Sequence, residues 1–192
     1  MSIITTEQVQ AWFEELAVLA RSNRLDYNSR PESQKTEGPR YKWKSPLKNK
    51  EIKTKLASET CAMNPNFITR SSADRKSREW LYDLTVREFN EKKQLISIPL
   101  VVEIELSDNK FSGIRYDFNK LLQADSPTKI LVIQQKTYER ATAIFNQLRP
   151  CIEQYQHRSE CIYMIACWVT SEYTWSHWHC YVEKKSKTTL AE

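Results

Sequence analysis

Apolar and polar positions alternate along the chain in a pattern that predicts a mixed α/β fold. Strand-like runs occupy residues 80–86, 100–106 and 129–135, and segments 161–170 and 177–182 form a closing hairpin. Apolar residues recur at helical spacing in segments 5–22, 114–123 and 138–154. Because helix 114–123 stands between two strands, it predicts a crossover and parallel pairing. We therefore expect a mixed central sheet flanked by helices.

The chain of 192 residues is long enough for one domain with a substantial core. We expect four parts: an N-terminal helix that packs on the domain (1–22), a basic polar arm or loop (23–58), an α/β core (59–183) and a polar tail (184–192). Residues 23–47 are expected to be irregular because Pro31, Pro39 and Pro46 interrupt any long element, and residues 48–58 could form a basic helix.

Two acidic residues lie on one face of the most apolar strand. In Leu100–Leu106, side chains alternate between faces, so Glu103 and Glu105 point the same way as Val101. An unpaired buried carboxylate costs several kcal/mol or takes up a proton. A bound divalent cation would remove this cost. On pattern alone, the two glutamates can also belong to the solvent face of an antiparallel strand.

Asp83 supplies a third carboxylate in the preceding strand-like run. If this run pairs with strand 100–106 as an antiparallel hairpin, Asp83 approaches Glu103 or Glu105. Clustered carboxylates suit an oxygen-preferring ion such as Mg²⁺ or Mn²⁺. The alternative places Asp83 on the strand surface or at a turn.

This order of residues resembles the PD-(D/E)xK nuclease superfamily, whose members have a restriction-endonuclease-like fold. The resemblance covers roughly residues 79–135: an Asp on one strand, an acidic pair on the next, then a helix and another apolar strand. It implies that Asp83 and Glu103 bind the metal and that Glu105 holds the position usually occupied by the catalytic lysine. Tyr82 stands in place of the family's proline.

In some members of that superfamily the lysine has moved to the following helix, and Lys120 resembles such a case. The resemblance therefore implies Asp83, Glu103, Glu105 and Lys120 as catalytic residues, with the first three also as metal ligands. By spacing alone, Lys120 can instead simply pair with Asp117 on the helix surface.

The composition of the chain excludes some classes of protein function and indicates its cellular compartment. Two glycines are too few for a phosphate-cradling glycine-rich loop, which excludes kinase-like and dinucleotide-binding fingerprints. Five cysteines without a CxxC pair favour reduced thiols. No apolar run approaches the length of a membrane span, and the first residues lack a cleavable signal pattern, so we expect a cytoplasmic protein.

Positive charge is concentrated in one stretch of the chain. Residues 35–55 contain eight Lys or Arg against two Glu, whereas the whole chain carries +5. Cations alternate with aromatic rings in residues 40–44, a combination that suits phosphate neutralisation and base stacking. We expect nucleic acid to contact Arg40, Lys42, Trp43, Lys44, Arg70, Arg75, Lys76 and Arg78. The alternative is a solvated loop whose Tyr41 and Trp43 pack against the domain.

His177 and His179 share a strand face next to Cys180, which invites a zinc hypothesis. Cys180 points the other way and no second pair stands at ligand spacing, so aromatic packing is favoured.

The functional hypothesis is a Mg²⁺-dependent nuclease that hydrolyses nucleic acid, with DNA favoured over RNA as the substrate and a homodimer compatible with it. A different hypothesis is a catalytically inactive nuclease-like fold that binds nucleic acid or protein. A third is an accessory subunit whose aromatic C-terminal hairpin forms a protein interface.

Overall fold

Six strands form one mixed sheet in the computed structural model of the chain, which describes residues 3–36, 38, 40–72, 80–107 and 110–183. In spatial order the strands are β1 (Phe67–Ser71), β2 (Leu84–Phe89), β3 (Leu95–Glu105), β4 (Thr128–Gln135), β5 (Cys161–Val169) and β6 (Thr174–Val182). The first three strands form an antiparallel meander, and β6 returns antiparallel to β5.

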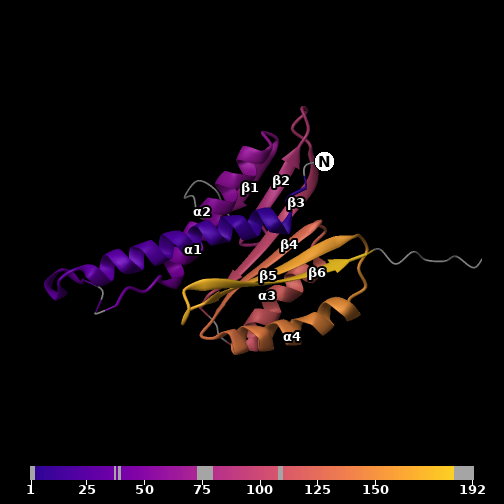
Figure 1. Cartoon of the computed structure of the whole chain (residues 1–192). Coiled ribbons are helices and arrows are strands. Elements are labelled where there is room, and N and C mark those ends of the chain that lie inside the picture. Colours follow the sequence, from indigo (N-terminus) through magenta and orange to yellow (C-terminus); the bar gives the residue numbers. More distant parts are fainter. Residues whose placement is uncertain (1–2, 37, 39, 73–79, 108–109, 184–192) are drawn as a thin grey trace, which may run out of the picture.

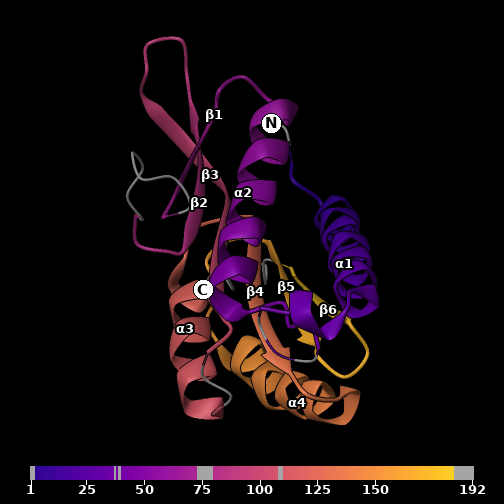
Figure 2. The ribbon, with the colours of Figure 1, turned by 90° about the vertical axis from the view of Figure 1, so that its left-hand side faces the viewer.

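Two crossover helices make the centre of the sheet parallel. Helix α3 (Phe111–Gln123) connects β3 to β4, and α4 (Tyr138–Gln154) connects β4 to β5, so the three strands run in one direction. The side of the molecule on which β4 and β5 end faces the viewer in Figure 2. The prediction of a mixed α/β sheet flanked by helices is confirmed.

The sheet is the middle of three layers. Helices α1 (Thr6–Ser29) and α2 (Ser45–Met63) lie on one face, and α3 and α4 lie on the other (Figure 1). One core, which includes Phe13, Leu56 and Val102, fills the space on the α1–α2 side. A second core, which includes Val101, Phe118 and Ile165, fills the α3–α4 side. The opposite placement of Val101 and Val102 confirms the predicted alternation of β3.

The N-terminal third of the chain is more helical than its composition indicated. Helix α1, capped by Thr5 in a capping box with Gln8, continues to Ser29, and its last part extends beyond the sheet (Figure 1). Residues 45–63 form α2, which agrees with the basic helix considered for residues 48–58 and extends it at both ends. The expected arm or loop is wrong for residues 23–29, which belong to α1, and for residues 45–47, which begin α2. Pro46 lies in the first turn of this helix and does not break it. The N–H groups of a first turn have no partner within the helix, so the missing N–H of proline costs no hydrogen bond there.

Two element boundaries differ from the predictions. Strand β2 begins only at Leu84, because Leu81 has a positive φ of 66° and the chain bends there. Strand β6 begins at Thr174, so the closing hairpin has a tighter turn than the expected 171–176. The tail of 184–192 lies outside the described residues. Among the helices of the described ranges, none is both long and apolar enough to cross a membrane.

Candidate functional site

The register of β2 and β3 places Asp83 next to Glu103. Leu84 pairs with Val102, so one residue beyond this pair Asp83 comes level with Glu103. The backbone N–H of Ile104 donates a hydrogen bond to Oδ2 of Asp83 at 2.8 Å. This bond fixes the Asp83 carboxylate at the start of β2, although residues 80–83 are not part of the strand.

A buried lysine holds the other oxygen of Asp83. Nζ of Lys53 lies 2.9 Å from Oδ1 of Asp83 and 3.0 Å from the Ser72 hydroxyl. Lys53 is only 2% exposed and comes from α2, on the opposite side of the sheet from α3. Lys53 was not among the residues predicted for the site. Its burial could have been predicted from the helical spacing of Lys48, Ile52, Leu56 and Thr60, which form a buried stripe next to Lys53.

Glu103 is almost fully buried, with 1% of its surface exposed. Its Oε2 forms an ion pair with Nζ of Lys120 at 2.8 Å. Its Oε1 is buried and has no hydrogen-bond partner among the described residues. The solvent-face alternative for Glu103 is therefore wrong, and one buried oxygen of this carboxylate has no partner within the described residues.

Lys120 connects α3 to β3 through its ion pair with Glu103. Besides Glu103, its Nζ contacts Oδ1 of Asp117, one helical turn earlier, at 3.1 Å. Tyr82 is half-buried beside the pair: its burial raises the pKa of its hydroxyl, as does the charge of Glu103, while the charge of Lys120 lowers it. Of the four predicted catalytic residues, Glu103 and Lys120 are thus in contact, and Asp83 lies close enough to Glu103 to affect its pKa.

Burial governs the electrostatics of this group. It raises the pKa of Glu103 to about 8, and the carboxylates of Asp83 and Asp117 act in the same direction, whereas Lys120 opposes them. Burial alone would lower the pKa of Lys120, but its two carboxylate partners outweigh this effect and raise it. Lys120 therefore stays charged, and a positive charge beside Glu103 is always present near neutral pH.

Glu105 has a different environment. Its Oε1 accepts hydrogen bonds from the backbone N–H and the hydroxyl of Ser107, both at 2.8 Å. Across the described ranges, no group of three or more His, Cys, Asp or Glu side chains is arranged to hold a metal ion. The carboxylate of Glu105 is thus bound to the turn that follows β3, and its role as a metal ligand stays a prediction.

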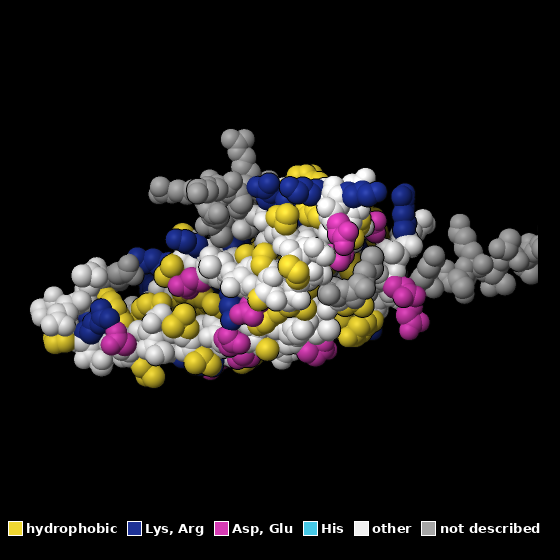
Figure 3. Space-filling model, turned by 90° about the horizontal axis from the view of Figure 1, so that it is seen from above, with side chains coloured by type: hydrophobic (Ala, Val, Ile, Leu, Met, Phe, Trp, Pro, Cys, Tyr) yellow, Lys and Arg dark blue, Asp and Glu magenta, His cyan; other side chains and the backbone are white. Residues whose placement is uncertain are grey.

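The uncovered part of the α3–α4 face carries cations and aromatic rings. Helix α3 packs on β3 and β4, and α4 packs on β4 to β6. On β1 and β2 the same face bears Ile68, Arg70, Arg87 and Phe89, and the ring of Trp80, from the segment before β2, lies against Arg87. We call these five residues the basic–aromatic face. In Figure 3, Lys and Arg side chains gather along one margin of the molecule.

Arg87 is the centre of the basic–aromatic face. Its guanidinium carbon lies 5.4 Å from the ring centre of Trp80 and 5.2 Å from that of Phe89. Its Nε is buried and without a hydrogen-bond acceptor in the described part of the chain, and burial followed by the charge of Arg70 lowers its pKa. Arg70 was predicted as a nucleic-acid contact. Arg87 was missed because the expected strand stopped at residue 86, whereas β2 continues to Phe89.

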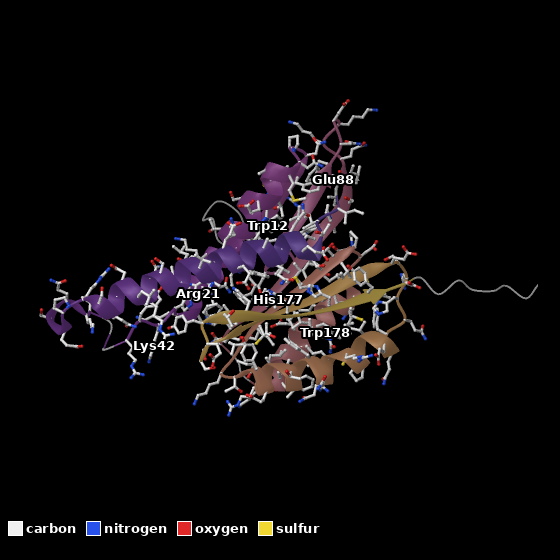
Figure 4. The ribbon with its side chains drawn as sticks, viewed as in Figure 1. Trp12, Arg21, Lys42, Glu88, His177 and Trp178 are labelled. Carbon is white, nitrogen blue, oxygen red and sulfur yellow. The ribbon has the colours of Figure 1, made fainter. Side chains whose placement is uncertain are left out.

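The expected contacts in residues 40–44 separate into two groups. Arg40, Lys42 and Lys44 are exposed, and Lys42 extends away from the ribbon (Figure 4). Trp43 is buried, donates a hydrogen bond to Glu51 and packs edge-on against Trp168. Its predicted stacking on nucleic acid is wrong, because the ring belongs to the core. Arg75, Lys76 and Arg78 lie outside the described residues.

His177 and His179 lie on β6 and face α1. His177 stacks on Phe13 and Trp175 between the two elements (Figure 4). Burial lowers the pKa of His177 to about 4. These contacts support aromatic packing as the role of His177.

Comparisons with protein-family models, with curated proteins and with solved structures find no match.

Proposed function

We propose that this protein is a Mg²⁺-dependent nuclease that hydrolyses phosphodiester bonds in nucleic acid, with DNA as the favoured substrate and an endonucleolytic mode of cutting. The observation that carries the proposal is the Glu103 carboxylate. It is buried, it lies level with Asp83, and it keeps one oxygen without a partner among the described residues while Lys120 holds the other.

The two carboxylates fit a hard divalent cation. Mg²⁺ binds in proteins through one or two carboxylates and completes its coordination with water and substrate phosphate. Oε1 of Glu103 is free of partners in the described residues. Each oxygen of Asp83 already accepts one hydrogen bond but retains a second lone pair. Asp83 and Glu103 would therefore hold Mg²⁺, or Mn²⁺ in its place.

Each residue of the site has a distinct task. The metal ion, when bound, activates a water molecule and stabilises charge on the scissile phosphate. Lys53 and the N–H of Ile104 hold Asp83 in place. Lys120, kept charged by Glu103 and Asp117, orients the attacking water or neutralises the phosphate. In the reaction, the water oxygen bonds to phosphorus, one P–O bond breaks, and the leaving oxygen ends with a proton.

The order of elements supports the same proposal. From α2 to β4 the chain runs as a helix, three antiparallel strands, a crossover helix and a parallel strand. The acidic residues lie where β2 begins and where β3 ends, and Lys120 lies on the crossover helix. This layout agrees with the resemblance to PD-(D/E)xK nucleases in which the lysine has moved to the helix.

The basic–aromatic face gives a nucleic-acid strand a place beside this site. Arg70 pairs in register with Thr85, two residues after Asp83. Cations next to exposed or half-exposed rings suit a phosphate backbone with unstacked bases. The surroundings of the acidic pair are therefore suited to a polyanionic substrate.

A cleavage assay tests the proposal directly. Plasmid, linear duplex, single-stranded DNA and RNA are incubated with Mg²⁺, with Mn²⁺ or with EDTA. We expect metal-dependent cutting, and we expect Asp83→Asn and Glu103→Gln each to reduce its rate at least about 100-fold. The matched control is Glu91→Gln, which makes the same change on an exposed residue of the β2–β3 turn and should cut like the native protein.

Two further measurements make the assay decisive. Thermal melting checks that each variant is folded, and calorimetric titration of Mg²⁺ without nucleic acid checks the metal site separately from catalysis. If all substrates stay intact and Mg²⁺ does not bind, the nuclease proposal is wrong. Nucleic-acid binding that persists in EDTA would then favour the alternative of an inactive fold, in which Lys53 and Lys120 serve only to neutralise the two carboxylates.

A further inference from the structure

A polar cavity lies at the carboxyl ends of β4 and β5, away from Asp83 and Glu103. It has a volume of about 340 Å³ and is lined by Gln134, Gln135, Lys136, Arg140 and Thr170. On β4, Leu131 is level with Glu103, and Gln135 lies four residues further along the strand. At about 3.3 Å per residue this separates the cavity from the acidic pair by roughly 13 Å along the sheet.

Main-chain hydrogen bonds build the walls of this cavity. The N–H of Thr170 donates to the carbonyl of Gln135 at 2.9 Å, and the N–H of Ser171 donates to that of Lys136 at 3.2 Å. The side chain of Gln134 is held from the other side by Lys48 at 2.8 Å and by Ser45 at 3.2 Å. The position of the lining residues is therefore fixed by the sheet and by α2.

Hydrogen-bond donors without partners dominate the lining. Lys136 and Arg140 form no ion pair with a carboxylate of the described residues. Gln135 is 5% exposed, and its buried Nε2 has no acceptor within the described chain. A buried donor without an acceptor is costly, so the cavity suits a ligand rich in acceptor oxygens.

The start of α4 adds positive potential to the same place. Thr137 caps this helix of 17 residues through the N–H of Arg140, and the positive end of its dipole lies beside the cavity. One carboxylate, Glu139, belongs to the same turn, but it is fully exposed, and its hydrogen bond with Thr137 helps to lower its pKa. Two cations, a buried amide and a helix start therefore outweigh one solvated acid.

We propose that this cavity binds a phosphate group. Its volume lies within the range of small-molecule sites and is large enough for a phosphate with part of a nucleotide. The phosphate can belong to a nucleic-acid backbone or to a free nucleotide or inorganic phosphate. Recognition of phosphate here does not depend on the metal or on Asp83 and Glu103, so the site stands apart from the nuclease proposal.

Binding measurements in EDTA test the phosphate site. Thermal melting with increasing inorganic phosphate or AMP reports the free ligand, and fluorescence anisotropy of a labelled oligonucleotide reports the backbone. We expect saturable binding of at least one of these ligands. The double variant Lys136→Gln, Arg140→Gln should weaken it at least tenfold, and Gln135→Leu should weaken it with little change in melting temperature. Both cations are exposed, so the double variant should fold.

Arg149→Gln is the matched control, because it removes a cation from the exposed surface further along α4. It should bind phosphate and oligonucleotide like the native chain. Asp83→Asn should also keep phosphate binding, which separates this site from the nuclease site. Binding of the oligonucleotide alone would assign the cavity to the backbone, and binding of phosphate or AMP alone would assign it to a free ligand. Absence of saturable binding, or an equal weakening in Arg149→Gln, would overturn the proposal.

Discussion

At the scale of single residues, the ion pair between Glu103 and Lys120 determines what the site can bind. Glu103 is buried and Lys120 is about one-third exposed, so water screens only one partner well. Removing one partner of a buried pair leaves a charge uncompensated, which costs more than removing a pair at the surface. Lys120 therefore stabilises the protein as long as no cation occupies the site.

We predict that Lys120→Met destabilises the metal-free protein by about 2 kcal/mol above about pH 8, where Glu103 is ionised, because Glu103 then has lost its nearest positive charge. Urea unfolding in EDTA measures this change. The double variant with Glu103→Gln should recover part of the stability, since the buried charge is removed as well. Lys92→Met, an exposed residue of the β2–β3 turn, is the control and should change stability little. If the destabilisation of the double variant equals the sum of those of Lys120→Met and Glu103→Gln, the two side chains do not stabilise each other and the prediction is wrong.

The sequence predicted the members of this site better than their contacts. Glu103 and Asp83 could be recognised because a carboxylate in an apolar strand needs a partner, and Lys120 followed from the family resemblance. The pairing of Lys53 with Asp83 could not be predicted, because the two residues are 30 positions apart and meet only when α2 packs on the sheet. Arg87 was not predicted because the expected strand ended at residue 86, so its contacts with Trp80 and Phe89 on one face of the sheet could not be foreseen.

At the scale of elements, α2 is the feature that composition hid. Its lysines suggested a solvated arm, yet Lys48 is 1% exposed and Lys53 is 2% exposed. A lysine can bury its long stem and keep its amine bonded, as Lys48 does with Gln134. By contrast, β4 and α4 could be predicted closely, because an unbroken apolar run and a regular 3.6-residue spacing leave few alternatives.

Burial of Lys48 should make stability depend on pH. Burial lowers its pKa to about 7, while the rings of Trp43 and Trp168, at 5.2 and 5.3 Å, favour the charged form and limit the effect. Between about pH 7 and the ordinary lysine pKa, the unfolded chain binds a proton that the native chain does not. Stability therefore rises with pH across this window, by about 2 to 4 kcal/mol.

Urea unfolding from pH 6.5 to pH 10 measures this dependence. In Lys48→Met the free energy of unfolding should rise less with pH than in the native protein, because methionine does not titrate. The difference between the two rises is the contribution of Lys48. Lys50→Met, an exposed lysine of the same helix, should keep the native rise. If native and Lys48→Met curves run parallel, Lys48 is charged throughout and its burial is compensated.

At the scale of the whole molecule, the three layers leave one region of the sheet open. Helices α3 and α4 cover β3 to β6, and α1 and α2 cover the opposite face (Figure 1). The basic–aromatic face on β1 and β2 lies beside the acidic pair, and the proposed phosphate-binding cavity lies at the ends of β4 and β5. A nucleic-acid strand that reaches Asp83 and Glu103 would approach across the open region.

The salt dependence of binding tests this approach. On a duplex, removing one cation that neutralises a phosphate should reduce the slope of log affinity against log salt by about 0.9. We therefore predict that Arg70→Gln lowers the slope by about this amount, measured by fluorescence anisotropy of labelled DNA in EDTA. Lys50→Gln, which removes a charge from the groove between α1 and α2 on the other side of the sheet, should leave the slope unchanged. A reduced slope in Lys50→Gln but not in Arg70→Gln would place the strand along the helices, remote from the acidic pair, and would thereby contradict the nuclease proposal as well.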